Sequence, residues 1–292
     1  MPMLMERPAR APIPTRDRPP NRLAQDITGR PYLSHSQLSL MRSCPARFSH
    51  RYVEKAPADF VASSLLLGGA IHHALEMHYR ARLEGLSIGL DALLSAFADG
   101  WKRQQEDAGQ DVPIRFNKGE DRSTLDALAT RMISTFLASP IASPRGEILG
   151  VEEELRVVLD PDLPDIIARV DLVTQTEDGL HVVDFKTSRS RWNQEKAIES
   201  ADQLVLYGAT VERMRQHLGL PVKLHFAILT KARTPIVQVL DIPADSGRLA
   251  TMRQTVAQLW EAIQTGNFYP SPSPMACTTC PYRSRCSVFG GG

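Results

Sequence analysis

Two carboxylates and a lysine near the middle of the chain have the residue types of a cation site. Asp171 ends the sequence Ala-Arg-Val-Asp, and Asp184-Phe-Lys186 ends the apolar run that follows it. Asp178-Gly179 lies between the two and predicts a two-residue hairpin turn. With that turn, Asp171 lies opposite Lys186 and diagonal to Asp184, so all three side chains project from one face of the hairpin. A four-residue loop preserves this shared face, whereas a loop of odd length breaks it.

Two neighbouring carboxylates repel each other, and a divalent cation between them removes that repulsion. The alternative is an exposed cluster of ion pairs on a solvated face of the sheet. Lys186 is one of only seven lysines among 34 basic residues. Arginine cannot lose its proton, and its planar group replaces a compact ammonium poorly beside a reacting water. We therefore expect a chemical role for Lys186.

The four cysteines form a second candidate site. Cys44 stands alone, and Cys277, Cys280 and Cys286 follow in a C-x2-C-x5-C pattern. Four thiolates commonly hold an iron–sulfur cluster or a structural zinc ion, and either would join two distant parts of the chain. The thiols can also be unliganded, so three interpretations remain open from the spacing.

Three further groups of residues have types suited to a site. His72 follows two glycines in Leu-Gly-Gly-Ala-Ile-His, and His73 points about 100° away around the same predicted helix. Gln203 and Tyr207 are four residues apart, so they share one face of their helix. Residues 152–154 are three glutamates, and one of them has the position to support a metal ligand from behind. Because adjacent acids more often form a solvated face, none of the three is predicted as a site residue.

Composition narrows the class of protein. With 292 residues and 42% hydrophobic content, the chain can bury a substantial core. It has no run of about 18 apolar residues, no apolar signal core and few cysteines, so we expect a cytoplasmic protein without a membrane span. The net charge of +1 excludes a globally basic nucleic-acid binder, and any such surface must be a local basic patch.

The hydrophobic pattern predicts helices and strands in an order typical of an α/β fold. Residues 1–30 are rich in proline and arginine and predict a disordered basic arm, followed by one domain over 31–292 with a helical insertion at about 85–145. The predicted helices cover 34–53, 65–83, 90–108, 124–138, 199–217 and 248–265. The predicted strands cover 148–159, 166–174, 180–185, 224–230 and 236–240. The polar segment 109–122 is predicted as a mobile loop, and the whole order indicates a sheet flanked by helices.

Five motifs in order resemble the PD-(D/E)XK nuclease superfamily, in the RecB-like branch that carries an iron–sulfur cluster. They are Ser36-Gln-Leu-Ser-Leu-Met-Arg-Ser-Cys-Pro-Ala-Arg-Phe48, Gly68-Gly-Ala-Ile-His72, Ala168-Arg-Val-Asp171, Val183-Asp-Phe-Lys-Thr187 with Gln203 and Tyr207, and the three late cysteines. That branch includes the AddB nuclease domain, exonuclease V and the nucleases of CRISPR adaptation. The resemblance implies a restriction-endonuclease-like α/β fold with a central mixed sheet flanked by helices. It also implies an N-terminal helical region and a C-terminal Fe–S lobe made of Cys44 and residues 270–292.

The resemblance assigns roles to the candidate residues. It implies that Mg²⁺ or Mn²⁺ is held by His72, Asp171, Asp184 and the carbonyl of Phe185. The metal would activate a water for phosphodiester hydrolysis, and Lys186 would position or help to deprotonate that water and stabilise the transition state. Gln203 and Tyr207 would contact the nucleic acid.

The same resemblance bears on the cysteines and on the expected function. Cys44, Cys277, Cys280 and Cys286 would hold a structural [4Fe-4S] cluster, since zinc ligands usually come in two close pairs. The expected function is a deoxyribonuclease, an exonuclease on single-stranded DNA ends in repair, recombination or related DNA processing. The alternatives are an endonuclease or end-trimming subunit of a larger complex, and a catalytically silent DNA-binding module. The chain has no Walker A motif, so a helicase partner would be a separate protein.

Overall fold

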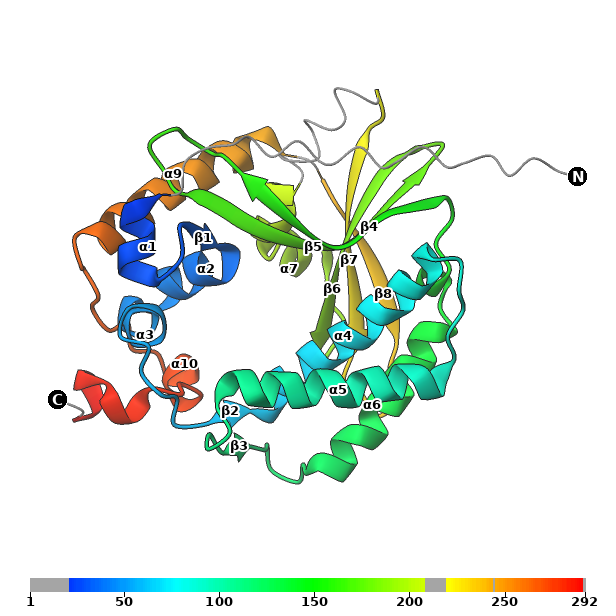
Figure 1. Cartoon of the computed structure of the whole chain (residues 1–292), viewed down its shortest axis with the longest axis horizontal. Helices are drawn as coiled ribbons and strands as arrows, with labels where there is room; N and C mark the ends of the chain where they lie inside the picture. Colours follow the sequence, from blue (N-terminus) through cyan, green and yellow to red (C-terminus); the bar gives the residue numbers. More distant parts are fainter. Residues whose placement is uncertain (1–20, 208–218, 244, 291–292) are drawn as a thin grey trace, which may run out of the picture.

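Six strands form a mixed β-sheet at the centre of the protein (Figure 1), within residues 21–207, 219–243 and 245–290, which the computed structural model describes. The strands are β1 Tyr32–Ser34, β4 Glu147–Val157, β5 Asp165–Thr176, β6 Gly179–Ser188, β7 Val222–Thr230 and β8 Val237–Ile242. Strands β5, β6, β7 and β8 lie side by side in that order, and both β4 and β1 pair with β5. The β6–β7 and β1–β5 pairs are parallel, and the others are antiparallel. This is the central mixed sheet that the motifs implied.

Strands β5 and β6 separate part-way along the sheet. Their ladder runs from Thr176–Gly179 to Leu172–Val183, whereas β6 stays paired with β7 as far as Ser188. Asp184, Phe185 and Lys186 therefore follow the last β5–β6 pair, on an edge of β6 that β5 no longer covers. We call this place the β5–β6 fork. Backbone groups at the fork are available to side chains instead of to a neighbouring strand.

The hairpin register differs from the predicted one: each β5 residue pairs with the β6 residue two positions before the predicted partner. The turn consists of Glu177 and Asp178, and Gly179 is already paired with Thr176. Asp171 consequently stands opposite Asp184, not opposite Lys186, although the predicted shared face is retained because the loop length stays even. The first position of β6 requires glycine, because a Cβ on Gly179 would lie 2.5 Å from the Pro221 carbonyl oxygen and its φ is +145°.

Three helices cover one face of the sheet: α4 Ser63–Leu83, α5 Leu90–Ala108 and α6 Arg122–Leu137. Their apolar side chains pack against the odd-numbered residues of β6 and β7, such as Val183, Phe185 and Ala227. The Phe185 ring stacks on Tyr79 of α4, with 5.7 Å between the ring centroids. The segment between α5 and α6 contains the short strand β3 Ile114–Arg115, which pairs with β2 Val61–Ala62 and thereby fastens a segment predicted to be a mobile loop.

The other face packs against helices that precede β4 in the sequence and helices that follow β6. These are α1 Arg22–Thr28, α2 His35–Ser43, α3 Pro45–Phe48, α7 Gln194–Glu199 and α9 Ser246–Gln264, together with helical residues 202–207. They contact even-numbered residues of β6 and β7, such as Val182 and Phe226. Helix α2 begins at Ser34 with a capping box, in which Ser34 and Gln37 exchange side-chain and backbone hydrogen bonds.

The remaining short elements of the described chain are turns and one short helix. They are the π-helical turn Ser49–Val53, the 3-10 turns Pro140–Ala142, Arg283–Arg285 and Ser287–Phe289, and α10 Pro274–Thr278. Figure 1 shows α10 close to α3, and the Ala46 backbone N–H donates to the Tyr269 carbonyl at 3.0 Å. Residues from opposite ends of the sequence therefore meet in one place.

Three sequence expectations need correction here. The predicted disordered arm is too long, since residues 22–28 form α1 and Ala24 is fully buried against the core, while residues 1–20 lie outside the described residues. The helix predicted over 34–53 is instead α2, α3 and a π-helical turn, because Cys44 has an extended backbone before Pro45. The predicted helix over 199–217 starts at 202, and its residues beyond 207 are outside the described part. Among the described helices, none has the length and apolar character required to span a bilayer.

Candidate active site

A cleft of about 800 Å³ opens at the β5–β6 fork, between the sheet and helices α4 and α5. Five residues predicted from the sequence line this cleft, namely His72, Asp171, Asp184, Lys186 and Gln203. Glu152 of β4, Arg169 of β5 and Lys231 beyond β7 also line it. The predicted site residues, which span more than 130 positions of sequence, thus converge on one cleft.

The two aspartates and the lysine make direct polar contacts at the fork. The Phe185 N–H donates to Asp171 Oδ2 at 2.6 Å, so the Asp171 side chain occupies the place of a strand partner. Lys186 Nζ lies 2.6 Å from Asp184 Oδ2 and donates to Gln203 Oε1 at 3.1 Å. The Asp184 side chain is only 1% exposed. Apart from the ion pair with Lys186, neither of its oxygens has a hydrogen-bond donor among the described residues.

His72 and Glu152 approach the same carboxylate from two other elements. His72 Nδ1 on α4 lies 3.6 Å from Asp171 Oδ2. Each of His72, Glu152 and Asp171 offers one ligand atom, and the three atoms lie within 4.8 Å of one another. His73 instead contacts Glu76 at 3.1 Å, so His72 is the histidine that faces the acids.

Sequence reasoning did not select Glu152, and the reason is local geometry. Strand β4 has an irregular register between Ile148 and Gly150, and Glu152 has a φ of +53°. The pairs Val151–Leu172 and Glu153–Val170 leave Glu152 opposite Asp171. A non-glycine residue at positive φ costs about 1–2 kcal/mol and often marks a functional site. The β4–β5 register places Glu152 beside Asp171. The run of three glutamates does not by itself predict that register.

The environment perturbs the pKa values of these groups in opposite directions. Burial, reinforced by the charges of Asp184 and Glu152, raises the pKa of Asp171 well above its usual value. Burial and the charge of Glu76 raise the pKa of Glu152 to about 7. Burial and the ammonium of Lys186 lower the pKa of His72 to about 4, so its imidazole is neutral at pH 7. The site therefore combines crowded carboxylates of raised pKa with a neutral imidazole.

Lys186 keeps its proton in this arrangement. Burial favours the neutral amine, but the carboxylates of Asp184 and Asp171 outweigh burial and raise the pKa of Lys186. An ammonium held in this way donates hydrogen bonds and stabilises negative charge. This favours the positioning and electrostatic role expected of Lys186 over proton abstraction.

The residues of the fork fit a hard divalent cation. They offer the carboxylates of Asp171 and Asp184 and a neutral imidazole, and the buried Asp184 carboxylate has Lys186 as its charged contact at 2.6 Å. Neighbouring buried carboxylates are costly unless cations compensate them. Carboxylate and carbonyl oxygens suit Mg²⁺ and Mn²⁺, and an imidazole is also accepted by Mn²⁺. The Phe185 carbonyl is within reach because the His72 ring hydrogen-bonds to the Phe185 backbone.

Gln203 and Tyr207 have different environments, although they share a helical face. Gln203 lines the cleft, holds Lys186 and donates its amide to the Tyr207 hydroxyl. Tyr207 is fully buried, and its hydroxyl donates to the Arg169 carbonyl of β5. The structure therefore corrects the expectation that Tyr207 contacts nucleic acid: its ring packs in the core and its hydroxyl positions Gln203.

The four cysteines line one small pocket, although 232 positions separate Cys44 from the next cysteine in the sequence. The segments that contribute them are tied together by backbone contacts, including the Asp59 N–H to the Pro281 carbonyl at 2.7 Å. No group of three cysteine sulfurs within the described chain lies mutually within 4.8 Å. The pocket thus gathers all four thiols without bringing them into close mutual contact.

A family model for the PD-(D/E)XK nuclease superfamily matches residues 32–287, which is most of the sequence. The chain belongs to the PD-(D/E)XK nuclease superfamily. Among solved structures, a candidate exonuclease from Eubacterium rectale is 12% identical, with 92% of this chain and 98% of that one covered and a TM-score of 0.48. SSO0001 is 14% identical, with 78% and 86% covered and a TM-score of 0.28. No curated protein matches this nuclease.

The superfamily assignment rests on the family model, since TM-scores below 0.5 add no support. In this PD-(D/E)XK nuclease, the letters of the motif correspond to Asp171, then Asp184, Phe185 and Lys186. All four residues lie at the β5–β6 fork, where one strand ends its pairing and the next continues. The residues that match the motif are therefore brought together at the β5–β6 fork.

We predict that this nuclease binds Mn²⁺ more tightly as the pH rises from 6 to 8. The raised pKa values of Glu152 and Asp171 leave part of their carboxyl groups protonated below about pH 7, and a metal must displace those protons. Below the pKa, the affinity should rise by up to about tenfold per pH unit for each proton released. Isothermal titration calorimetry in two buffers of different ionisation enthalpy measures both the affinity and the proton count.

Glu152→Gln should reduce the number of protons released, whereas Glu154→Gln is the matched control. Glu154 lies on the same strand and is exposed. A Mn²⁺ affinity that is independent of pH, or equal proton release from both variants, would contradict the raised pKa of Glu152.

Proposed function

We propose that this protein is a Mg²⁺- or Mn²⁺-dependent deoxyribonuclease, an exonuclease that acts on ends of single-stranded DNA. The observation that carries the proposal is the convergence of the buried Asp184 carboxylate, Asp171, His72 and the Lys186 ammonium in one open cleft. Binding of a divalent cation would compensate the cost of burying these carboxylates. The superfamily assignment supports phosphodiester hydrolysis as the reaction.

The proposed ligands are His72, Asp171, Asp184 and the Phe185 carbonyl, and Glu152 lies beside them. A bound divalent cation lowers the pKa of water and offsets the negative charge of the phosphoryl transition state. Lys186 donates hydrogen bonds to the attacking water or to a phosphate oxygen, since its pKa is raised. Gln203 fixes the direction of the Lys186 side chain through their 3.1 Å hydrogen bond.

The cleft has features that suit a single strand. The Asp184 side chain is 1% exposed and that of Asp171 is 12% exposed, so a phosphate must descend to the floor of the cleft to reach them. A flexible single strand does this more readily than a stiff duplex. Arg103, Arg169 and Lys231 line the walls, where their side chains can contact the phosphates of a strand that enters the cleft.

Hydrolysis of linear and circular single-stranded DNA by wild-type protein tests this proposal. With Mn²⁺, we expect loss of end-labelled linear strands and no nicking of the circular strand, because an exonuclease requires an end. Cleavage of the circular strand would replace the exonuclease with an endonuclease. No cleavage of either, by protein that still binds DNA, would favour the partner-dependent nuclease or the silent DNA-binding module. Adding a helicase or another DNA-processing protein then separates those two.

For the cysteines, we propose a structural [4Fe-4S] cluster that joins Cys44 to the C-terminal segment. The shared pocket supports a common ligand for all four thiols. A zinc ion with Zn–S bonds of about 2.3 Å holds its sulfurs about 3.8 Å apart. No three sulfurs of the described cysteines lie within 4.8 Å of one another, so they are not arranged as three ligands of a zinc ion. Phosphodiester hydrolysis transfers no electrons, so the cluster is proposed to stabilise the fold.

A further inference from the structure

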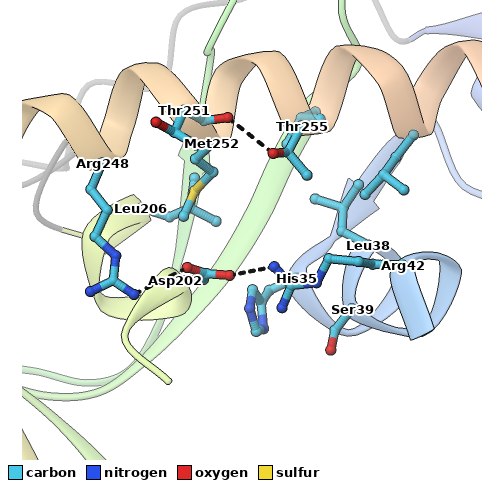
Figure 2. Close-up of a pocket in the computed structure, with 12 residues that line it drawn as sticks. His35, Leu38, Ser39, Arg42, Asp202, Leu206, Arg248, Thr251, Met252 and Thr255 are labelled. Atoms are coloured by element: carbon cyan, nitrogen blue, oxygen red, sulfur yellow. Dashed lines mark hydrogen bonds and ion pairs between the residues drawn. The ribbon is translucent and has the colours of Figure 1, made fainter. Parts of the chain in front are cut away.

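A second pocket lies between α2, the helical residues 202–207 and α9, and no residue of the proposed metal site lines it. Its volume is about 160 Å³, which is smaller than the roughly 300–1,000 Å³ of a site for a drug-sized ligand. Figure 2 shows α9 along one side of the pocket and α2 on the other, with Asp202 between them. The apolar part of its lining consists of Leu38, Leu206, Met252, Val256 and Leu259. The pocket has room for one small unit of a larger ligand.

Two arginines share one carboxylate at the mouth of this pocket. Arg42 Nη1 of α2 lies 2.7 Å from Asp202 Oδ2, and Arg248 Nη2 of α9 lies 3.5 Å from Asp202 Oδ1. Figure 2 shows the two guanidinium groups reaching Asp202 from opposite sides. The cluster has a net positive charge, and 56% of the Arg42 side chain is exposed. Guanidinium groups beside an apolar floor are suited to a phosphate whose attached group packs on that floor.

The pocket is adjacent to the catalytic cleft along two segments of chain. His35 lines the pocket and Ser36 lines the cleft, and likewise Asp202 lines the pocket and Gln203 lines the cleft. Lys186 is near enough to His35 that its charge, after burial, helps to lower the pKa of His35 to about 4. His35 is therefore neutral at pH 7 and forms an uncharged wall between the two cavities.

We propose that this pocket binds one nucleotide of the single strand that the nuclease cuts, with a phosphate on Arg42 and Arg248 and the sugar and base on the apolar floor. The inference rests on the proposed function, because it assumes that the strand passes through the neighbouring cleft. A phosphate contact outside the metal site fixes the register of the strand relative to the reacting phosphate. The alternative is that the three charged residues only tie α2, residues 202–207 and α9 together.

Binding of a fluorescein-labelled single-stranded oligothymidylate in EDTA tests the pocket without hydrolysis. In fluorescence anisotropy, the double variant Arg42→Gln/Arg248→Gln should bind about tenfold or more weakly, since it cannot make the charge-assisted hydrogen bonds to phosphate. The slope of log affinity against log salt should fall by roughly 0.7 for each phosphate that the variant no longer neutralises. Thr251→Asp, which places a carboxylate at an exposed position of the pocket wall, should weaken binding without removing either arginine.

Arg253→Gln is the matched control, because Arg253 is also on α9 but pairs with Asp160 and does not line the pocket. The proposal is overturned if the double variant and the control bind equally, or if the double variant has a lower melting temperature with unchanged DNA affinity and salt slope. Absence of DNA binding by the wild type overturns it as well. A wild type that binds but cleaves nothing, with the double variant weakened, removes the nuclease proposal and keeps the pocket.

Discussion

Asp184→Asn should abolish DNA hydrolysis while leaving the protein folded. The substitution removes a proposed metal ligand and the ion-pair partner of Lys186, and we expect the rate with Mn²⁺ to fall about a thousandfold or more. Asparagine has nearly the same shape, and it removes one of the neighbouring carboxylate charges while Asp171 remains close to the Lys186 ammonium. The melting temperature in EDTA should therefore stay the same or rise, as is typical when an active-site charge is neutralised.

End-labelled single-stranded DNA, incubated with wild type and variant side by side, measures the rate, and thermal unfolding measures stability. Glu177→Gln is the control, because Glu177 is an exposed residue in the turn of the same hairpin. DNA affinity in EDTA should survive the Asp184 substitution. A variant that still cleaves at a tenth of the wild-type rate would remove Asp184 from the metal site, and equal inactivity of the control would point to damage of the hairpin.

Cys280→Ser should remove the visible absorbance of an iron–sulfur cluster and strongly destabilise the protein. All four cysteines line one pocket, so losing one ligand affects the junction between α3 and the C-terminal segment. A structural metal centre contributes on the order of 10 kcal/mol to folding in small domains, and even half of that lowers the melting temperature by roughly 10 °C in a chain of this size. Anaerobically purified protein, with iron and sulfide assays beside the spectrum, provides the measurement.

Thr278→Ser is a control two residues before Cys280, since Thr278 has a backbone-bonded hydroxyl and serine preserves that group. Wild-type protein that is colourless and contains one zinc ion per chain would replace the cluster with zinc. Wild-type protein without metal, as stable as Cys280→Ser, would leave the thiols unliganded.

Local patterns predicted the strands of the hairpin and the face that its charged residues share. The alternation of Val and Ile around Asp171 and Asp184 is a property of neighbouring residues, so it is readable without a structure. The predicted register of β5 and β6 was wrong by two residues. The observed register depends on the contact of Gly179 with Pro221, which lies just before β7 and is distant in the sequence. The shared face was still predicted correctly, because any loop with an even number of residues leaves these side chains on the same face of the hairpin.

The missed features all depend on contacts between distant segments. Glu152 enters the site through an irregular β4–β5 register, and Tyr207 is buried because its hydroxyl meets the backbone of β5. Arg42 and Asp202 are 160 positions apart in sequence, and nothing near either one signals their contact. Helix α1 was assigned to a disordered arm because only Ala24 and Thr28 of its seven residues are buried. Tertiary packing decided each of these cases.

The contact between α3 and residues 269–284 also has a consequence for synthesis on the ribosome. Helix α3 and the residues after it obtain partners such as Tyr269, Pro281 and Ser284 only when more than 200 further residues have been translated. At about 5–20 residues per second, that delay lasts on the order of 10 s or more. The sheet and helices α4–α6 can assemble earlier, while α3 waits. A nascent chain therefore completes the junction between α3 and residues 269–284 late, and ribosome pausing before residue 269 should prolong the exposure of α3 to chaperones and proteases.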